Sequence, residues 1–252
     1  MNNKIITKNS FLQLNNKFSK NLLFKKNYFS LYKLFLSKTL PKRLAHQTLW
    51  FGEPVLQLPQ DLMIFQEIIF KSKPDYFIEV GVAWSGSLLY YSSIFNILGG
   101  KKIIGIDNFI PKQIENRIQK FQKLKKNIKL IKGISTDDQV LIKLKKIIKN
   151  SKKVLIHLDS DHSQENVLKE LNIYSQFIKK NSYIVCGDTH VEFFKKNPHG
   201  KNKKYSKGNN PMTALNIFLK TKEGKKFKQD LTYHNRYFLT LNPLGILKKI
   251  KD

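Results

Sequence analysis

The sequence predicts a doubly wound α/β fold with a mostly parallel sheet, and three observations support that prediction. Short apolar runs rich in β-branched residues alternate with longer segments whose apolar residues recur at helical spacing, which is the order expected of strands joined by helices. A turn with two glycines, residues 81–87, joins the first such run to a helix. Three of the runs end on an acid, at Asp107, Asp159 and Asp188. Right-handed crossovers would place these acids along one edge of the sheet.

The first part of the chain, residues 1–44, is predicted to be a basic amphipathic extension outside the sheet. It is rich in lysine, asparagine and aromatic residues. Between Leu22 and Leu40 the apolar residues recur at helical spacing with lysines between them, so we expect one amphipathic helix. Such a helix can pack on the folded part of the chain or lie on a membrane surface, and both interpretations stay open.

The following elements are predicted in order along the chain. Residues 48–61 contain two prolines and a glycine and should form an extended lead-in, with Asp61 capping the first helix. Strands are predicted at residues 76–80, 102–107, 128–131, 153–159 and 182–188. Helices are predicted at residues 62–70, 88–98, 111–126, 137–149, 163–178 and 212–220. The chain should close with an antiparallel hairpin of residues 237–241 and 246–250.

The turn after the first strand has the composition of a ligand-binding turn. Its pattern is Glu79-x-Gly81 followed by Gly86, and glycine lets the backbone approach a ligand closely. The start of the next helix offers free N–H groups and positive potential. Asp107, at the end of the second strand, can accept hydrogen bonds from both hydroxyls of a ribose. The unit therefore predicts a nucleoside-type ligand, with a plain strand-to-helix turn as the structural alternative.

A second group of polar residues follows the fourth and fifth strands. Asp159 and Asp188 could together hold Mg²⁺, which would orient and acidify a substrate hydroxyl. His162 lies three residues after Asp159 and could act there as a general base. The structural alternatives are that Asp159 or Asp161 caps the next helix, and that His162 belongs to the first turn of that helix.

Three further residues have a structural and a functional interpretation. Trp84 could stack on an adenine ring or merely pack against its neighbours. His157, in the middle of a strand, is expected to be a core histidine with its hydrogen bonds satisfied. Cys186, on a buried strand, is expected to be inert, and as the one cysteine of the chain it cannot form an internal disulfide.

The net charge of +28 suggests an anionic partner. Only three of the 46 basic residues are arginine, the residue that favours bidentate contacts to nucleic acids, so we do not expect a nucleic-acid partner. Anionic lipid or an acidic glycan is a better match. No apolar run reaches transmembrane length and the first residues lack the apolar core of a signal peptide, so we expect neither feature. We expect a cytoplasmic protein with peripheral contact at the inner face of the membrane.

Several linked motifs resemble the cephalosporin hydroxylase / rhamnosyl O-methyltransferase family. They are Trp50-Phe51-Gly52, Leu58-Pro59-Gln60-Asp61, residues 77–87, Gly105-Ile106-Asp107, residues 158–162, Asp188-Thr189, residues 207–211 and residues 239–243. The resemblance covers about residues 45–250. It implies a Rossmann-like class I fold dependent on S-adenosylmethionine (SAM) for residues 45–252. It also implies O-methylation of a sugar, a glycolipid or a small metabolite.

The resemblance also implies roles for individual residues. Glu79, Gly81 and Gly86 would shape the cofactor pocket, Asp107 would bind the ribose, and Asp159 and Asp188 would be the metal-binding acids. From the residues themselves we add Ala83, Trp84 and Ser87 to the cofactor pocket and expect His162 and Asp159 to be catalytic. One position departs from the family, because metal-dependent members carry two adjacent acids where this chain has Gly187 and Asp188. Glu192, His190 or water would then complete a Mg²⁺ site, or the enzyme would be independent of metal.

The loop 189–210 is expected to be a lid over the acceptor, with Asn209 and Asn210 donating to sugar hydroxyls. Assembly into a homo-oligomer is left open. Two rival functions remain at this stage. One is a hydroxylase that binds iron through His162, His190 and Asp159, and the other is a non-catalytic SAM-fold protein that binds a partner or RNA.

Overall fold

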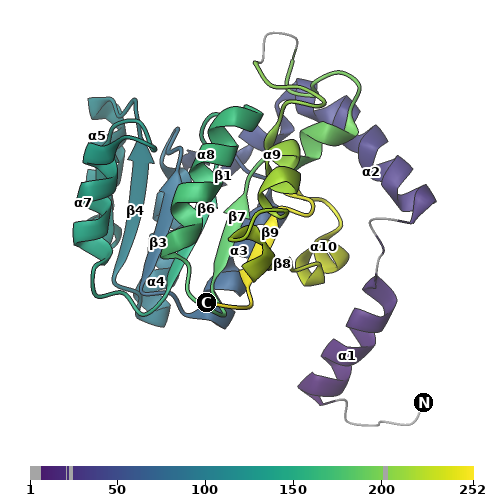
Figure 1. Ribbon diagram of the computed structural model, residues 1–252, viewed down its shortest axis with the longest axis horizontal. Coiled ribbons are helices and arrows are strands. Elements are labelled where there is room, and N and C mark those ends of the chain that lie inside the picture. Colours follow the sequence, from purple (N-terminus) through teal and green to yellow (C-terminus); the bar gives the residue numbers. More distant parts are fainter. Residues whose placement is uncertain (1–6, 21, 23–24, 201–203) are drawn as a thin grey trace.

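A sheet of seven strands forms the centre of the protein (Figure 1). The structure is a computed structural model, which describes residues 7–20, 22, 25–200 and 204–252. The strand order is β5-β4-β3-β6-β7-β9-β8. The strands are β3 (Tyr76–Val80), β4 (Lys102–Asp107), β5 (Ile128–Lys132), β6 (Val154–Leu158), β7 (Tyr183–Cys186), β8 (Phe227–Gln229) and β9 (Ile246–Lys249). The first five run parallel, and β9 lies antiparallel between β7 and β8. The predicted doubly wound, mostly parallel sheet is confirmed.

Helices cover both faces of the sheet. One face carries α7 (Asp138–Ile148), α8 (Gln164–Tyr174) and α9 (Pro211–Phe218), which lie in front of the sheet in Figure 1. The other carries α3 (Pro59–Ser72), α4 (Gly86–Leu98), α5 (Lys112–Lys120) and α10 (Thr232–Tyr237). Successive strand residues point to opposite faces, so Ile78 packs in the first core and Phe77 in the second. Both side chains are fully buried because helices cover both faces of the sheet, so two successive positions of β3 are apolar.

The N-terminal extension contains two helices, α1 (Lys8–Ser19) and α2 (Lys26–Thr39), where one helix over residues 22–40 was predicted. Residues 21, 23 and 24 of that prediction lie outside the described residues. Helix α2 packs on the rest of the chain through Tyr32 and Leu36, which are fully buried. The Tyr32 hydroxyl also donates to the Thr240 carbonyl at 2.8 Å. Helix α1 buries no residue and lies beside α10.

The lead-in is more structured than predicted. It contains the short 3-10 turns η1 (Leu40–Lys42) and η2 (Leu44–His46), and a hairpin of β1 (Thr48–Trp50) and β2 (Glu53–Val55). Helix α3 begins at Pro59, so the prediction that Asp61 caps it is wrong. Asp61 is buried, and its carboxylate accepts hydrogen bonds from Thr240 Oγ1 and the Leu241 N–H. It therefore links α3 to a loop far along the chain.

The helix predicted over residues 111–126 is divided in two. Helix α5 ends at Lys120 and α6 (Gln122–Lys125) follows at once. The break is at Phe121, which leaves the helical conformation (φ −103°, ψ 73°) and whose ring stacks with that of Phe51, 6.3 Å away between centroids. Tertiary packing of an aromatic side chain thus overrides a local pattern of helical spacing.

The predicted closing hairpin is wrong in its first strand. Strand β9 pairs with β8 at residues 227–229, whereas residues 232–237 form α10. The backbone of residues 240–242 cannot join a ladder because side chains bind it. Thr240 O accepts from Tyr32, Leu241 N donates to Asp61, and Leu241 O accepts from His190. Sequence spacing carries no sign of these long-range bonds.

Three short turns complete the fold: η3 (Ser175–Phe177), η4 (Thr189–Phe193) and η5 (Gly224–Lys226). The predicted loop 189–210 therefore starts with η4, and its residues 201–203 lie outside the described residues. Among the described helices, none combines the length and apolarity needed to cross a bilayer.

Candidate active site

A cleft of about 600 Å³ opens at the carboxyl ends of the parallel strands. It lies where the strand order reverses between β3 and β6, the position at which doubly wound sheets bind ligands. Its volume is in the range of small-molecule sites. The residues proposed from the sequence for cofactor, metal and catalysis all line it: Glu79, Gly81, Ala83, Trp84, Gly86, Ser87, Asp107, Asp159, His162 and Asp188.

The turn between β3 and α4 is held in an unusual conformation. Gly81 has a φ of +94°, and an added Cβ would lie 2.2 Å from the Asp159 carbonyl oxygen, so only glycine fits. Ala83 and Ser85 also have positive φ, at 44° and 66°. Asp107 stabilises the turn, since its Oδ2 accepts from the Val82 and Ala83 N–H groups at 2.8 and 3.4 Å. Backbone strain of this kind is concentrated at ligand sites.

Glu79 and Gly86 serve the packing behind this turn. Glu79 is buried and accepts from Ser87 Oγ at 2.6 Å, and burial raises the pKa of the Glu79 carboxyl to about 8. A Cβ on Gly86 would lie 2.2 Å from the Pro54 carbonyl oxygen, so this glycine allows strand β2 to approach the start of α4. Both residues line the cleft, but their nearest contacts are to the protein itself.

Trp84 stands at the mouth of the cleft with 45% of its surface exposed. The Arg117 guanidinium lies 4.5 Å from the centre of its ring, a cation–π distance. Arg117 in turn pairs with Glu53, at 3.5 Å between Nε and Oε2. The indole is thus oriented by its neighbours while much of it stays available to a ligand.

Asp159 follows β6 and contacts a buried histidine. His157 lies between two carboxyls, with Nδ1 3.5 Å from Glu79 Oε1 and Nε2 3.9 Å from Asp159 Oδ2. Neither ring nitrogen makes a hydrogen bond within the described structure, so the prediction of a satisfied core histidine is wrong. Burial raises the pKa of Asp159 to about 7, although His157 opposes the shift. Burial also lowers the pKa of His157.

Gly187 brings β7 close to Asp159. A Cβ at this position would lie 2.3 Å from Asp159 Oδ1, so the Asp159 carboxylate occupies the space that a side chain at residue 187 would need. A chain with an acid here would have to place Asp159 differently.

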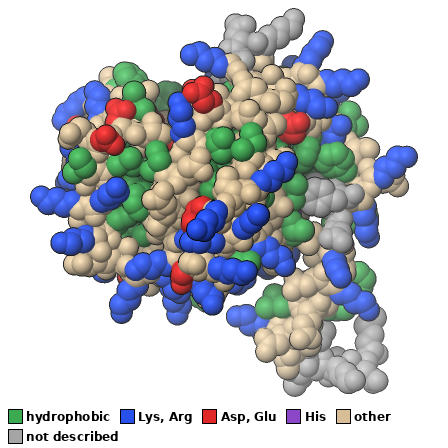
Figure 2. All heavy atoms as spheres, in the orientation of Figure 1, with side chains coloured by type: hydrophobic (Ala, Val, Ile, Leu, Met, Phe, Trp, Pro, Cys, Tyr) green, Lys and Arg blue, Asp and Glu red, His purple; other side chains and the backbone are tan. Residues whose placement is uncertain are grey.

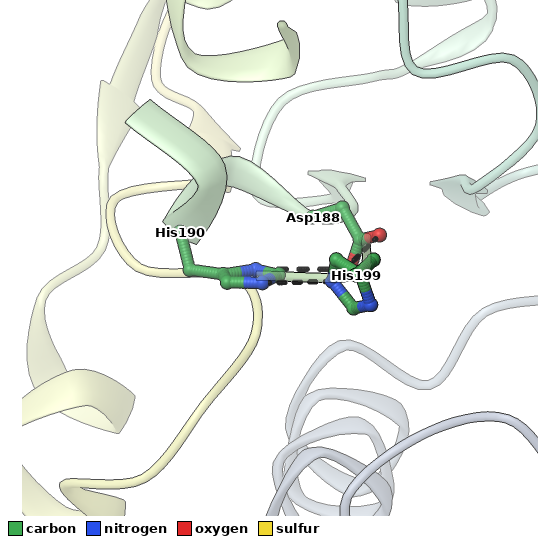
Figure 3. Close-up of side chains that lie close together, drawn as sticks. All are labelled: Asp188, His190 and His199. Carbon is green, nitrogen blue, oxygen red and sulfur yellow. Dashed lines mark hydrogen bonds and ion pairs between the residues drawn. The ribbon is translucent and has the colours of Figure 1, made fainter. Parts of the chain in front are cut away.

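Asp188 is surrounded by three histidines. Its carboxylate lies 3.6 Å from His162 Nε2, 3.7 Å from His199 Nε2 and 3.8 Å from His190 Nδ1. Burial would raise the pKa of Asp188, but these imidazoles, His199 foremost, lower it to about 2. Asp188 has a φ of 51°, which turns its side chain out of the strand direction. Figure 3 shows it facing His190 and His199.

His162 precedes α8 and is not part of its first turn. The N-cap position of the helix is Ser163, so neither Asp159 nor Asp161 occupies it, although Asp161 Oδ1 accepts from the Ser163 N–H at 2.8 Å. The His162 ring packs edge-on against Tyr205, 4.9 Å away between centroids. His162 therefore remains at the cleft surface with one nitrogen directed at Asp188.

The expectation that both Asn209 and Asn210 bind sugar is wrong for Asn210. That residue is buried, its side chain caps α9, and its amide donates to Glu192 and the Ser206 carbonyl. Asn209 accepts from the Gln164 N–H at 2.9 Å. Glu192 is likewise used to hold this loop, since it also accepts from the Gly208 N–H.

Several residues of the cleft were missed by sequence reasoning. His199 and Tyr205 reach it from the long loop, and Ser135 reaches it from the turn after β5. Ser135 and Ser160 both donate to Glu170, a buried acid on α8, at 2.5 and 2.6 Å. The Gly133-Ile134-Ser135 turn could have been found, because it follows a parallel strand as the other site turns do. No pattern in the neighbouring sequence indicates that His199 or Glu170 lies at the site.

Comparison with known proteins identifies relatives of this arrangement. Residues 42–250 match the family model described as Rhamnosyl O-methyltransferase/CmcI. A rhamnosyl O-methyltransferase of Mycobacterium tuberculosis H37Rv is 24% identical over 204 residues, covering 80% of this chain and 78% of the relative. The enzyme of the same name from Mycobacterium leprae is 24% identical over 203 residues, covering 79% of this chain and 82% of the relative.

Solved structures agree at the level of the fold. An apo structure of CmcI matches with a TM-score of 0.57 and 17% identity, covering 82% of this chain and 78% of that one. A structure of CmcI described as its Mg–SAM form matches with a TM-score of 0.52 and 17% identity, covering 81% and 77%. The sheet and its covering helices are therefore those of a Rossmann-like class I methyltransferase.

Proposed function

Because the chain belongs to the Rhamnosyl O-methyltransferase/CmcI family and is a SAM-dependent O-methyltransferase, we propose that it methylates a hydroxyl of a sugar carried by a glycolipid. The observation that carries this proposal is that one continuous cleft contains both the glycine turn between β3 and α4, which suits a nucleoside, and a group of acids and histidines. The name of the mycobacterial relatives supports a rhamnosyl acceptor.

The cofactor is proposed to lie along the turn between β3 and α4. Asp107 accepts two backbone N–H groups through Oδ2 and one, from Phe109, through Oδ1, which leaves a lone pair on Oδ1 for a ribose hydroxyl. Trp84 supplies an exposed aromatic face for the adenine. When bound, SAM supplies an electrophilic methyl group.

Catalysis is assigned to His162 with Asp159 and Asp188. His162 accepts the proton of the acceptor hydroxyl, and Asp188, 3.6 Å away, stabilises the imidazolium that results. Asp159, on the neighbouring strand, lies across the cleft edge from Asp188 and positions the hydroxyl. Methyl transfer needs its reactants in line, so orientation by these groups supplies much of the acceleration.

Mg²⁺ is a further cofactor proposed for this edge, on the carboxylates of Asp159 and Asp188. The donor set here suits it only in part. Gly187 contributes no oxygen, and three imidazoles surround Asp188, whereas Mg²⁺ prefers oxygen ligands. When bound, Mg²⁺ would acidify the acceptor hydroxyl. The residues described above account for binding and proton removal without it.

The N-terminal extension is proposed to hold the enzyme at an anionic membrane surface, on the cytoplasmic side. The first 52 residues contain ten basic residues and no acid. Apolar side chains stay exposed on both helices, at Phe11, Leu14 and Phe18 of α1 and at Tyr28, Leu31, Leu34 and Phe35 of α2. Basic residues are worth about 1 kcal/mol each near such a surface. Figure 2 shows lysine and arginine side chains over much of the visible face, with few acids between them.

Sedimentation with vesicles tests the membrane proposal. Vesicles with anionic lipid should retain the protein at low salt, and neutral vesicles should not. Leu34→Glu should weaken retention, whereas Ile97→Glu, at another exposed apolar site, on α4, should not. Equal retention of the two variants would contradict the proposal.

Methyl transfer itself is tested with SAM labelled in its methyl group and a rhamnosyl glycolipid as acceptor. The label should appear on a sugar hydroxyl. His162→Gln should lower the rate by a factor of about 10²–10⁴ while SAM affinity stays unchanged. Transfer at the wild-type rate in that variant would remove His162 from the proposed role.

A further inference from the structure

Asp188, His190 and His199 form a cluster that the methyl-transfer proposal does not use as a unit. One potential ligand atom from each residue lies within 4.8 Å of the other two. The three residues come from different elements: the end of β7, the turn η4 and the loop that follows it (Figure 3). Asp159, the other proposed metal-binding acid, is not a member of the group. The arrangement therefore differs from a pair of carboxylates on adjacent strands.

The hydrogen bonds of His190 fix its tautomer. Its Nδ1 lies 2.9 Å from the Leu241 carbonyl oxygen, which can only accept, so Nδ1 carries the proton. The neutral ring then presents an unprotonated Nε2. Metal-binding histidines are commonly oriented in this way, by a carbonyl that binds the second nitrogen.

The two imidazoles meet at the distance expected of two ligands of one ion. His190 Nε2 and His199 Nε2 are 2.9 Å apart. Nitrogens held roughly 2.1 Å from one metal are separated by about 3.0 Å when they subtend a right angle, and by about 3.4 Å in a tetrahedral site. His199 Nε2 and Asp188 Oδ2 are 3.7 Å apart, which is also within the span of two such bonds.

Burial and position determine which side of this cluster is open. His190 is fully buried, whereas Asp188 and His199 line the cleft. An ion held by the three side chains would thus be covered by the protein on the His190 side, and its remaining positions would face the acceptor side of the cleft. His199 comes from the long loop, so the ion would also join that loop to the end of β7.

We propose that Asp188, His190 and His199 bind a divalent transition-metal ion of the zinc, iron, cobalt or nickel class. Two imidazoles and one carboxylate suit such ions better than Mg²⁺, which prefers oxygen ligands. The site does not depend on the identity of the acceptor or on methyl transfer, because all three ligands are fixed by contacts within the protein.

The test uses the full chain stripped of metal with a chelator and titrated with Co²⁺, whose visible absorption reports imidazole ligands, followed by competition with Zn²⁺. We expect the wild type to bind one Co²⁺ ion per chain. His199→Ala should weaken the affinity at least about 100-fold, since even loss of a second-shell partner costs 10- to 100-fold. Asp138→Asn, at an exposed acid in the first turn of α7 outside the cleft, is the control and should leave Co²⁺ affinity unchanged.

The outcomes separate this site from the alternatives. Binding that is absent in the wild type, equal in His199→Ala, or displaced by millimolar Mg²⁺ would overturn the proposal. Circular dichroism and SAM titration of each metal-free variant show that it is folded. They also keep the two proposals distinct, because loss of Co²⁺ binding with SAM binding retained contradicts only the metal site.

Discussion

The cofactor half of the cleft, at the β3–α4 turn and the end of β4, and the acceptor half, at the ends of β6 and β7, are built differently. In the cofactor half the hydrogen bonds that hold the turn join residues of one strand–turn–helix–strand unit, as in the bonds from Val82 and Ala83 to Asp107, 25 and 24 positions away. In the acceptor half they join distant segments. His190 is held by Leu241, Leu241 by Asp61, and the neighbouring Thr240 by Tyr32 of the N-terminal extension.

The two halves also differ in charge. The cofactor half has a buried carboxyl, Glu79, whose pKa is raised by burial and which accepts a hydrogen bond from Ser87 Oγ. The acceptor half combines Asp159, whose pKa is raised, with Asp188, whose pKa is lowered by histidines. Such divergence between neighbouring carboxyls is typical of catalytic sites. The β3–α4 turn, which is proposed to bind the cofactor, and the acids at the ends of β6 and β7, which are proposed to act in catalysis, thus line the same cleft.

The largest effect is expected from Gly81→Ala, which should disable the cofactor half. Its Cβ would overlap the Asp159 carbonyl, and the positive φ adds strain, so we expect a loss of about 3 kcal/mol in unfolding free energy and no measurable SAM binding. Gly99→Ala is the matched control, with a φ of +86° but nothing within 4 Å of the new Cβ. It should cost only about 1–2 kcal/mol and keep SAM affinity. Equal losses in urea melts would show that packing at Gly81 is irrelevant.

The next effect should fall on the acceptor half. Asp61→Ala leaves the Thr240 hydroxyl and the Leu241 N–H without their buried acceptor, at a cost of about 3 kcal/mol. Methyl transfer should fall because Leu241 holds His190, whose Nδ1 lies 3.8 Å from the catalytic Asp188, while SAM affinity should change little. Asp138→Ala, an exposed acid in the first turn of α7, should cost no more than about 1 kcal/mol. A parallel loss of SAM affinity in Asp61→Ala would contradict the separation of the two halves.

The pH dependence of stability should reveal the raised carboxyl pKa values. Burial raises the pKa to about 7 in Asp61 and Asp159 and to about 8 in Glu79, so the folded state holds protons that the unfolded state has released. Stability should therefore fall as pH rises from about 5 to 8.5. Each group contributes up to about 1.4 kcal/mol per pH unit between its unfolded-state pKa near 4 and its folded-state pKa, and its contribution to the slope vanishes above the latter. The buried histidines have lowered pKa values and oppose this trend until their unfolded-state imidazoles are also neutral, at about pH 7.5.

Glu79→Gln should make that fall shallower in urea melts at pH 6.5 and 8.5, because one of the three titrating carboxyls is then absent. An unchanged slope would show that Glu79 is ionised throughout this range.

The smallest effect is expected from Tyr32→Phe. It removes the hydroxyl that donates to the Thr240 carbonyl and should lower the free energy of unfolding by about 1 kcal/mol, with SAM affinity unchanged. Tyr28→Phe, at an exposed position of the same helix, should change stability by less than about 0.5 kcal/mol. A larger loss in Tyr28→Phe than in Tyr32→Phe would show that α2 docks through a different face.

The sequence predicts the cofactor half better than the acceptor half for a physical reason. Strand, turn and acid follow one another within residues 76–107, so their spacing alone brings Gly81 and Asp107 together. His199, by contrast, reaches Asp188 only through the course of a long loop, and Asp61 is bonded 180 residues away, to Leu241. The failed hairpin at residues 237–241 has the same origin, since side chains from elsewhere occupy its backbone groups.

The most direct test of the account is calorimetric titration with SAM of the wild type, Asp107→Ala and His199→Ala, each with and without added metal. The account predicts binding to the wild type, loss of binding in Asp107→Ala, and retained binding in His199→Ala. That pattern would place the cofactor on the β3–α4 turn and separate it from the histidine cluster. Absence of SAM binding to the wild type under every condition, or equal loss in both variants, would contradict the central claim.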